Sequence, residues 1–185
     1  MTAELAMPVP RISPFRRFLR WVSQWKTFSI GILITSLFVI AALFAPWIAP
    51  YPPDETDYNQ RFAPPSLEHL MGTDEHGRDI FSRVLYGGQI SLYVGIFSVV
   101  LSSLLGIPLG LTTGFFGGRY DNVVSRINDA FFAVPGILWA ISIVAVLGPS
   151  ANAALLALAV ARLPVTIRLS RAAVISAKES EYVEA

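Results

Sequence analysis

The chain has 185 residues, of which 54% are hydrophobic and only 15% are charged. This composition is typical of a membrane protein. The absence of cysteine excludes a disulfide framework and a thiolate metal site, while the net charge of +1 says less than the placement of the charges along the chain.

Three long segments contain no charged residue. They lie between Lys26 and Asp54, between Arg83 and Arg119, and between Asp129 and Arg162. A helix needs about 20 apolar residues to cross the hydrocarbon of a bilayer, so each segment can span a membrane at least once. A signal peptide is the less favoured interpretation of the first segment, because a long arm precedes it and further spans follow it.

The first neutral segment predicts a span over residues 28–49, between an N-terminal arm (1–27) and a loop (50–89). Pro46 and Pro50 bracket its exit from the membrane, and Trp47 and Tyr51 suit the interface. Residues 90–185 are expected to begin the main transmembrane domain.

The second span is predicted within residues 90–116, where Pro108 should kink the helix or end its regular hydrogen bonding. Gly117 and Gly118 then supply a turn. The third neutral segment, 130–161, is about 32 residues, roughly 48 Å as one helix, which exceeds the hydrocarbon thickness. Residues 148–150, Gly-Pro-Ser, therefore predict a helical hairpin, which makes four spans in all.

The charges at the span ends predict the orientation, because Lys and Arg favour the cytoplasmic side. The N-terminal arm is basic, with Arg11, Arg16, Arg17, Arg20 and Lys26 against Glu4. The loop is acidic, with Asp54, Glu55, Asp57, Glu68, Asp74, Glu75 and Asp79 against Arg61, Arg78 and Arg83. We therefore expect a cytoplasmic N-terminus and an external loop. Four spans then place Arg162, Arg168, Arg171 and Lys178 inside, as the charge rule requires.

Small residues recur every four positions along the second span, at Ser98, Ser102, Gly106, Gly110 and Gly114. They predict close packing with neighbouring helices, and their drift around the helix predicts more than one neighbour. Ala153, Ala157 and Ala161 form a similar stripe in the fourth span. Ordinary membrane-helix packing is the simpler interpretation, and sliding during alternating access is the sharper one.

No catalytic or metal-binding constellation is evident in the sequence. Both histidines, His69 and His76, fall in the loop and are expected to be solvated rather than to bind zinc with Asp74 or Glu75. Ser82 and Ser91 have no positioned base. No ionisable residue lies near the centre of a neutral segment, which argues against an intramembrane proton relay, and no phosphate-binding loop is present.

Several segments, in order, resemble a known family. Residues 72–83, Gly-Thr-Asp-Glu-His-Gly-Arg-Asp-Ile-Phe-Ser-Arg, resemble the G-T-D-x-x-G-R-D-x-x-S-R signature of C-type permeases of dipeptide and oligopeptide ABC importers. Residues 91–95, 106–110 and 114–118 continue the resemblance. The motif residues carried over from it are Gly72, Thr73, Asp74, Gly77, Arg78, Asp79, Ser82 and Arg83. The chain's last residues resemble the start of the E-A-A loop: Glu181, Tyr182, Val183, Glu184 and Ala185.

The resemblance implies an all-α polytopic helix bundle in a prokaryotic inner membrane, with four predicted spans of an expected six. It implies a homologous second permease, two cytoplasmic ATPases that dock on the E-A-A loop, and an external substrate-binding protein. ATP and Mg²⁺ would be used by the ATPases, so the permease itself is expected to bind no cofactor or metal, to catalyse no reaction and to contact no nucleic acid. The cargo is open among dipeptides, oligopeptides, nickel chelates and other small solutes.

Three local interpretations accompany this family assignment. Ser176 and Glu179 fit a capping box, which predicts that a coupling helix begins near Ser176. The Gly-Thr-Asp segment is interpreted either as loop bracing through Arg78 and Asp79 or as a docking surface for the binding protein, and bracing is favoured. The end of the chain inside the E-A-A motif also allows a second hypothesis, a truncated assembly fragment that does not transport.

Overall fold

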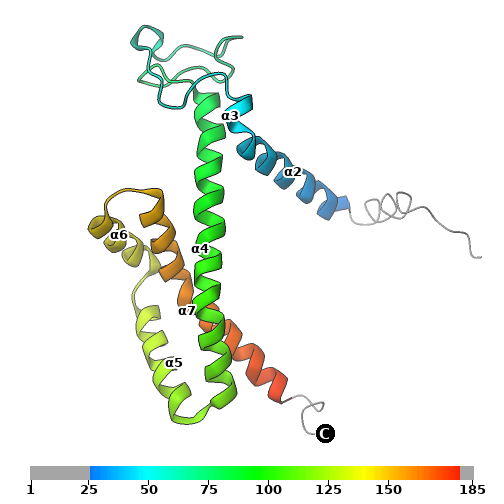
Figure 1. Cartoon of the computed structure of the whole chain (residues 1–185), viewed down its shortest axis with the longest axis vertical. Helices are drawn as coiled ribbons and strands as arrows, with labels where there is room; N and C mark the ends of the chain where they lie inside the picture. The colour runs from blue at the N-terminus through cyan, green and yellow to red at the C-terminus, as the bar shows by residue number, and fades with distance from the viewer. Residues whose placement is uncertain (1–25, 180–185) are drawn as a thin grey trace, which may run out of the picture. The chain divides into compact units, whose positions relative to one another are not determined.

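The computed structural model describes residues 26–179, and Figure 1 shows that these residues are mostly helical. The elements are α2 (Lys26–Leu43), α3 (Ala45–Ile48), the short 3₁₀ helix η1 (Tyr58–Gln60), α4 (Ile80–Phe116), α5 (Gly118–Ala133), α6 (Gly136–Leu147) and α7 (Ala151–Lys178). Within the described range no β-strand forms, and the one isolated bridge joins Thr73 to Asp79. The predicted all-α class is confirmed. The arm before residue 26 and the predicted coupling residues 181–185 lie outside the described residues.

The chain divides into two compact units, residues 1–88 and 89–185. The first holds α2, α3, the loop and the first turns of α4. The second holds the rest of α4 together with α5, α6 and α7. Residues 80–89, predicted as part of the external loop, are helical, because α4 starts at Ile80.

Three helices in the described range are long and apolar enough to cross a membrane: α2, α4 and α7. The predicted third span is broken, because α5 and α6 meet at an angle of 81°. Pro135 stands at this break, α5 is amphipathic, and α6 is mostly apolar but only 12 residues long. The total is therefore three unbroken spans, or four if the bent pair is one span.

The hairpin predicted at residues 148–150 is confirmed. Helix α6 ends at Leu147, and α7 begins at Ala151. Ser150 caps α7, since its hydroxyl accepts a hydrogen bond from the Ala153 N–H at 3.1 Å.

Two local predictions concern Pro108 and Ser176, and the second is wrong. Pro108 lies inside α4, which continues to Phe116, so the helix does not end at Pro108, and the predicted kink stays a prediction. Ser176 lies inside the last turn of α7, so the capping box of Ser176 and Glu179 does not start a helix. The short sequence pattern fits a cap, but the preceding residues are already helical and nothing between Pro164 and Ser176 interrupts them.

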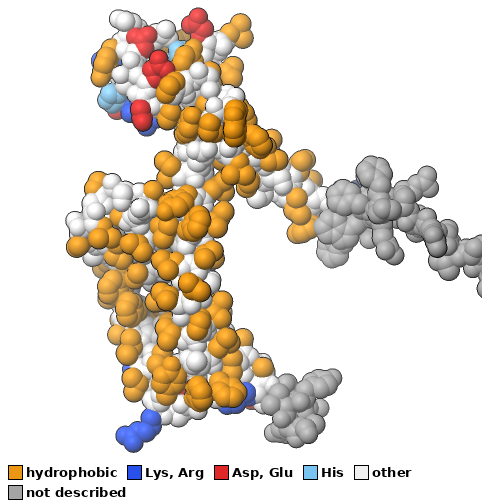
Figure 2. Space-filling view, in the orientation of Figure 1, with side chains coloured by type: hydrophobic (Ala, Val, Ile, Leu, Met, Phe, Trp, Pro, Cys, Tyr) orange, Lys and Arg blue, Asp and Glu red, His pale blue; other side chains and the backbone are white. Residues whose placement is uncertain are grey.

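The second unit has small residues inside and large apolar residues outside. Ser98, Ser102, Thr113, Ala153 and Ala157 are almost completely buried. Large side chains such as Phe97, Leu104 and Leu169 are exposed, and Figure 2 shows hydrophobic side chains over much of the helical surface. This arrangement suits a bilayer, where lipid solvates large apolar groups and small residues let helices approach closely.

Candidate functional site

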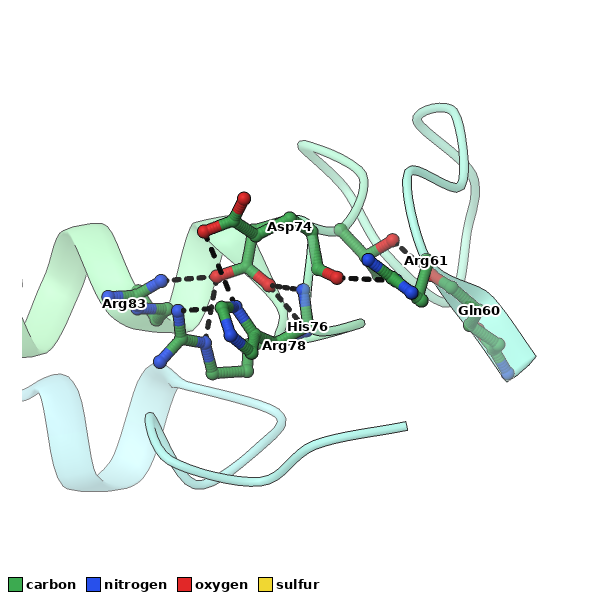
Figure 3. A network of polar contacts seen from close by, with 8 residues as sticks. Gln60, Arg61, Asp74, His76, Arg78 and Arg83 are labelled. Carbon is green, nitrogen blue, oxygen red and sulfur yellow. Dashed lines mark hydrogen bonds and ion pairs between the residues drawn. The ribbon is translucent and has the colours of Figure 1, made fainter. Parts of the chain in front are cut away.

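The Gly-Thr-Asp motif of the loop, residues 72–83, is built around the Asp74 carboxylate. The backbone N–H groups of His76 and Arg78 donate to Asp74 Oδ1 at 2.8 and 3.0 Å. The Arg78 Nε donates to Oδ2 at 2.8 Å, and Arg83 Nη1 makes a further ion pair with the same oxygen. Figure 3 shows Asp74 between these groups. One carboxylate thus caps a turn and pairs with two arginines.

The turn after Asp74 requires glycine at position 77. Gly77 has φ +75°, in the left-handed region that side chains disfavour. A Cβ at this position would also overlap the Asp57 carbonyl. The two loop segments therefore approach this closely only because residue 77 is a glycine, which has no Cβ.

A second carboxylate, Asp79, joins the loop to α4. Its Oδ2 accepts from the Ser82 N–H at 2.7 Å, as an N-terminal cap does, and its Oδ1 lies 3.0 Å from His69 Nδ1. The other ring nitrogen of His69 lies 2.8 Å from Gln60 Oε1, and the ring packs on Tyr51 at 4.9 Å between centroids. His69 is buried, so the prediction that both histidines are solvated is wrong for His69.

The surroundings of both carboxyls hold them ionised. For Asp74, burial opposes ionisation, but the donors of Arg78 and His76 outweigh it, and the pKa lies well below its usual range. For Asp79, burial again raises the pKa, but the hydrogen bonds from Ser82 and then from His69 outweigh it, so the pKa is lowered overall. Arg78 pairs with Asp74 rather than with Asp79. Each of these contacts lies within the loop or at the start of α4, which is the geometry of internal bracing.

The small-residue stripe of α4 lies against α7. An ideal Cβ on Gly106 would lie 2.9 Å from the Thr166 Cβ. On Gly110 it would lie 2.5 Å from the Ile167 carbonyl oxygen, and on Gly114 2.8 Å from the Arg171 carbonyl oxygen. The Ser102 and Thr166 hydroxyls are 3.0 Å apart. From Ser102 to Gly114 the stripe therefore lies against α7, and the prediction of more than one neighbour along its length stays a prediction.

Polar contacts tie α7 to α5. Arg171 binds Asp121 in a bidentate pair, with Nε and Nη2 at 2.5 and 2.6 Å from the two carboxylate oxygens. Arg168 pairs with Asp129 at 3.0 Å, and Asn128 Nδ2 donates to the Pro164 carbonyl at 3.2 Å. A cavity of about 190 Å³ is lined by Asn128, Asp129, Arg168 and Arg171 together with Thr113 and Ile167. These contacts join two helices rather than pairing the charges of α5 among themselves.

Two family models match the chain. Residues 106–185 match the binding-protein-dependent transport system inner membrane component, and residues 13–65 match the N-terminal transmembrane domain of oligopeptide transport permease C. A dipeptide transport system permease protein of Alkalihalophilus pseudofirmus is 41% identical over 190 residues, covering 100% of this chain and 62% of the relative. The chain belongs to this permease family. Its N-terminal match places it with the C-type permeases of peptide importers.

Other permeases match with similar coverage. A di/tripeptide transport system permease protein of Pseudomonas aeruginosa is 41% identical over 179 residues, covering 94% of this chain and 59% of the relative. A glutathione transport system permease protein of Escherichia coli is 39% identical over 183 residues, covering 95% and 60%. The chain thus spans about 60% of the length of the curated permeases it matches.

The sequence did not predict two parts of the site, the surroundings of His69 and the pair of Asp121 with Arg171. Tyr51 and Gln60 both contact His69, but neither belongs to the recognised loop motif. The Asp121 to Arg171 pair joins residues fifty positions apart, and only the opposite charges hinted at it. Within residues 26–179, no group of three or more His, Asp or Glu is placed to hold a metal ion.

Proposed function

We propose that the chain is part of the transmembrane permease of an ATP-driven importer of peptides or related small solutes. The observation that carries this proposal is the 41% identity to a dipeptide permease along 100% of the chain. Helices α2, α4 and α7 supply the apolar length that such a role requires. The relatives are named for dipeptides, di/tripeptides and glutathione, so peptides lead among the cargoes.

The complete importer would contain a second, homologous permease, two cytoplasmic ATPases and an external binding protein. ATP and Mg²⁺ would be bound by the ATPases. Residues 181–185 would contact an ATPase, because they resemble the E-A-A loop and directly follow α7 along the chain. The N-terminus would be cytoplasmic, which is supported by the basic arm and by the acidic loop of residues 50–89.

Uptake of a labelled dipeptide tests the transport proposal. The protein expressed from its native locus is reconstituted in liposomes with its neighbouring permease, ATPases and binding protein. We expect uptake that requires both ATP and the binding protein. Substituting Glu184→Lys should abolish ATPase attachment and uptake, whereas the matched change Glu68→Lys in the loop should leave ATPase attachment intact. Uptake that is independent of ATP would refute the proposal.

The orientation has its own test, which the absence of cysteine makes direct. Single cysteines are introduced by Glu68→Cys in the loop and Arg126→Cys on α5, and intact cells are treated with a membrane-impermeant thiol reagent. Labelling of the cysteine at 68 alone is expected. Labelling at 126 instead would reverse the proposed topology.

A further inference from the structure

The last turns of α7 are bound to their neighbours through three basic side chains. Arg168 and Arg171 pair with Asp129 and Asp121 of α5. Lys178 donates from Nζ to the Phe115 carbonyl of α4 at 2.9 Å. We call these three contacts the α7 clamp. They lie within the last three turns or so of α7, in the part of the helix that precedes residues 181–185 along the chain.

The same turns of α7 also pack on α4 at backbone distance. Gly110 faces the Ile167 carbonyl and the Arg171 backbone nitrogen, and Gly114 faces the Arg171 carbonyl. Since a methyl group does not fit at either glycine without displacing backbone atoms, α4 and α7 have little room to shift sideways here. Arg171 therefore meets α4 with its backbone and α5 with its side chain, which makes it the junction of the three helices.

The contacts of the α7 clamp differ in strength. Arg168 and Asp129 are more than half exposed, and such a pair contributes little. The Asp121 side chain is only 14% exposed, holds Arg171 through two parallel bonds, and accepts a further bond from the Ser125 hydroxyl at 3.1 Å. Bidentate geometry adds both energy and a fixed orientation. The Asp121 to Arg171 pair is thus the principal contact of the clamp.

We propose that the α7 clamp makes α5, α7 and the Gly110 to Gly114 part of α4 move as one body, with Asp121 and Arg171 as the positioning residues that transmit movement from residues 181–185 into the bundle. This inference rests on the proposed function, because it presumes an ATPase acting at those residues. It assigns to a specific ion pair the step between ATPase closure and helix movement. Interfaces of packed helices with fixed polar contacts shift as units rather than bend continuously.

Covalent replacement of an ion pair tests whether α5 and α7 move together. The exposed pair is replaced by Asp129→Cys with Arg168→Cys, and a short, reducible bifunctional thiol reagent joins the two cysteines in the assembled importer. Because the helices do not separate in the proposed cycle, cross-linked protein should transport at least as well as the unlinked variant. Loss of uptake on cross-linking, with recovery on reduction, would overturn the proposal.

Removal of the principal contact tests whether it carries the coupling. Asp121→Asn leaves Arg171 without its charged partner, and we expect uptake per ATP hydrolysed to fall about fivefold or more, within the usual range of coupling between sites. Arg126→Gln is the matched control, because Arg126 is an exposed α5 residue that forms no hydrogen bond or ion pair with α7 in the described part of the chain. The double variant Asp121→Arg with Arg171→Asp should recover part of the ratio. A merely structural role would lower uptake and ATP hydrolysis in proportion and leave the ratio unchanged, which would contradict the inference.

A distance measurement separates failure of this inference from failure of the proposed function. Spin labels at Val123 of α5 and Leu169 of α7, both exposed, report the separation of the two helices with and without ATP in the assembled complex. The clamp requires the same distance in both states, whatever the cargo is. A change of distance on ATP binding would refute the clamp even if peptide uptake is demonstrated, and a constant distance would support it even if the cargo is not a peptide.

Discussion

The substitution Gly110→Ala measures how closely α4 and α7 approach. An ideal Cβ at this position lies 2.5 Å from the Ile167 carbonyl oxygen, 2.6 Å from the Ser170 Cβ and 3.0 Å from the Arg171 nitrogen. Ordinary contact distances begin at 3.4 Å. Two of the three atoms belong to the backbone of α7, so a rotamer change does not relieve the overlap and the helices must separate.

Two opposing effects set the magnitude. Alanine stabilises a helix interior over glycine by about 1 kcal/mol. Overpacking of a close-packed site costs about 1 to 3 kcal/mol, and backbone overlap places Gly110 at the upper end. The expected net loss is therefore about 1 to 2 kcal/mol. The loss would come with weaker packing of every contact between α4 and the second half of α7.

Gly95→Ala provides a matched control on the same helix. A Cβ at Gly95 meets no atom within 4 Å, so the same substitution should leave stability unchanged or raise it. Both variants are purified in one detergent, and their unfolding is followed by helical circular dichroism against increasing denaturant. If Gly110→Ala is as stable as Gly95→Ala, the close crossing of α4 and α7 is refuted.

Three further predictions concern polar contacts. Asp74→Ala removes the acceptor of two arginines and two N–H groups and should destabilise the loop by about 3 kcal/mol, seen as faster amide hydrogen exchange, while the exposed Glu68→Gln should not. Because Asp74 and Asp79 have pKa values lowered from 3.8 in the folded loop, the unfolded chain binds protons first as the pH falls. Loop stability should thus be complete above about pH 5 and decline below about pH 4, and protease resistance that is constant down to pH 3 would contradict this. Ser102→Ala removes the hydroxyl contact with Thr166 and should cost only about 0.6 kcal/mol in the same denaturation assay, so a loss several times larger would show that this bond was underestimated.

The sequence determined the class of this protein and its helical segments. Long uncharged segments must be helical in lipid because every backbone group has to be hydrogen-bonded, so α2, α4 and α7 were predictable from composition. Gly148 to Ser150 marked the hairpin, because the apolar run was too long for one span. The loop motif and the later segments were specific enough to indicate the permease family.

Only the tertiary structure decided which residues meet. A local pattern suggested a helix start at Ser176, yet this residue lies within the last turn of α7. Its position in a loop predicted that His69 is solvated, but folding of the loop buries it between Tyr51, Gln60 and Asp79. Periodicity predicts which residues share a helix face but not which helix lies opposite, because that depends on contacts distant in sequence. The α4 stripe on α7 and the pairing of Asp121 with Arg171 are therefore properties of the fold.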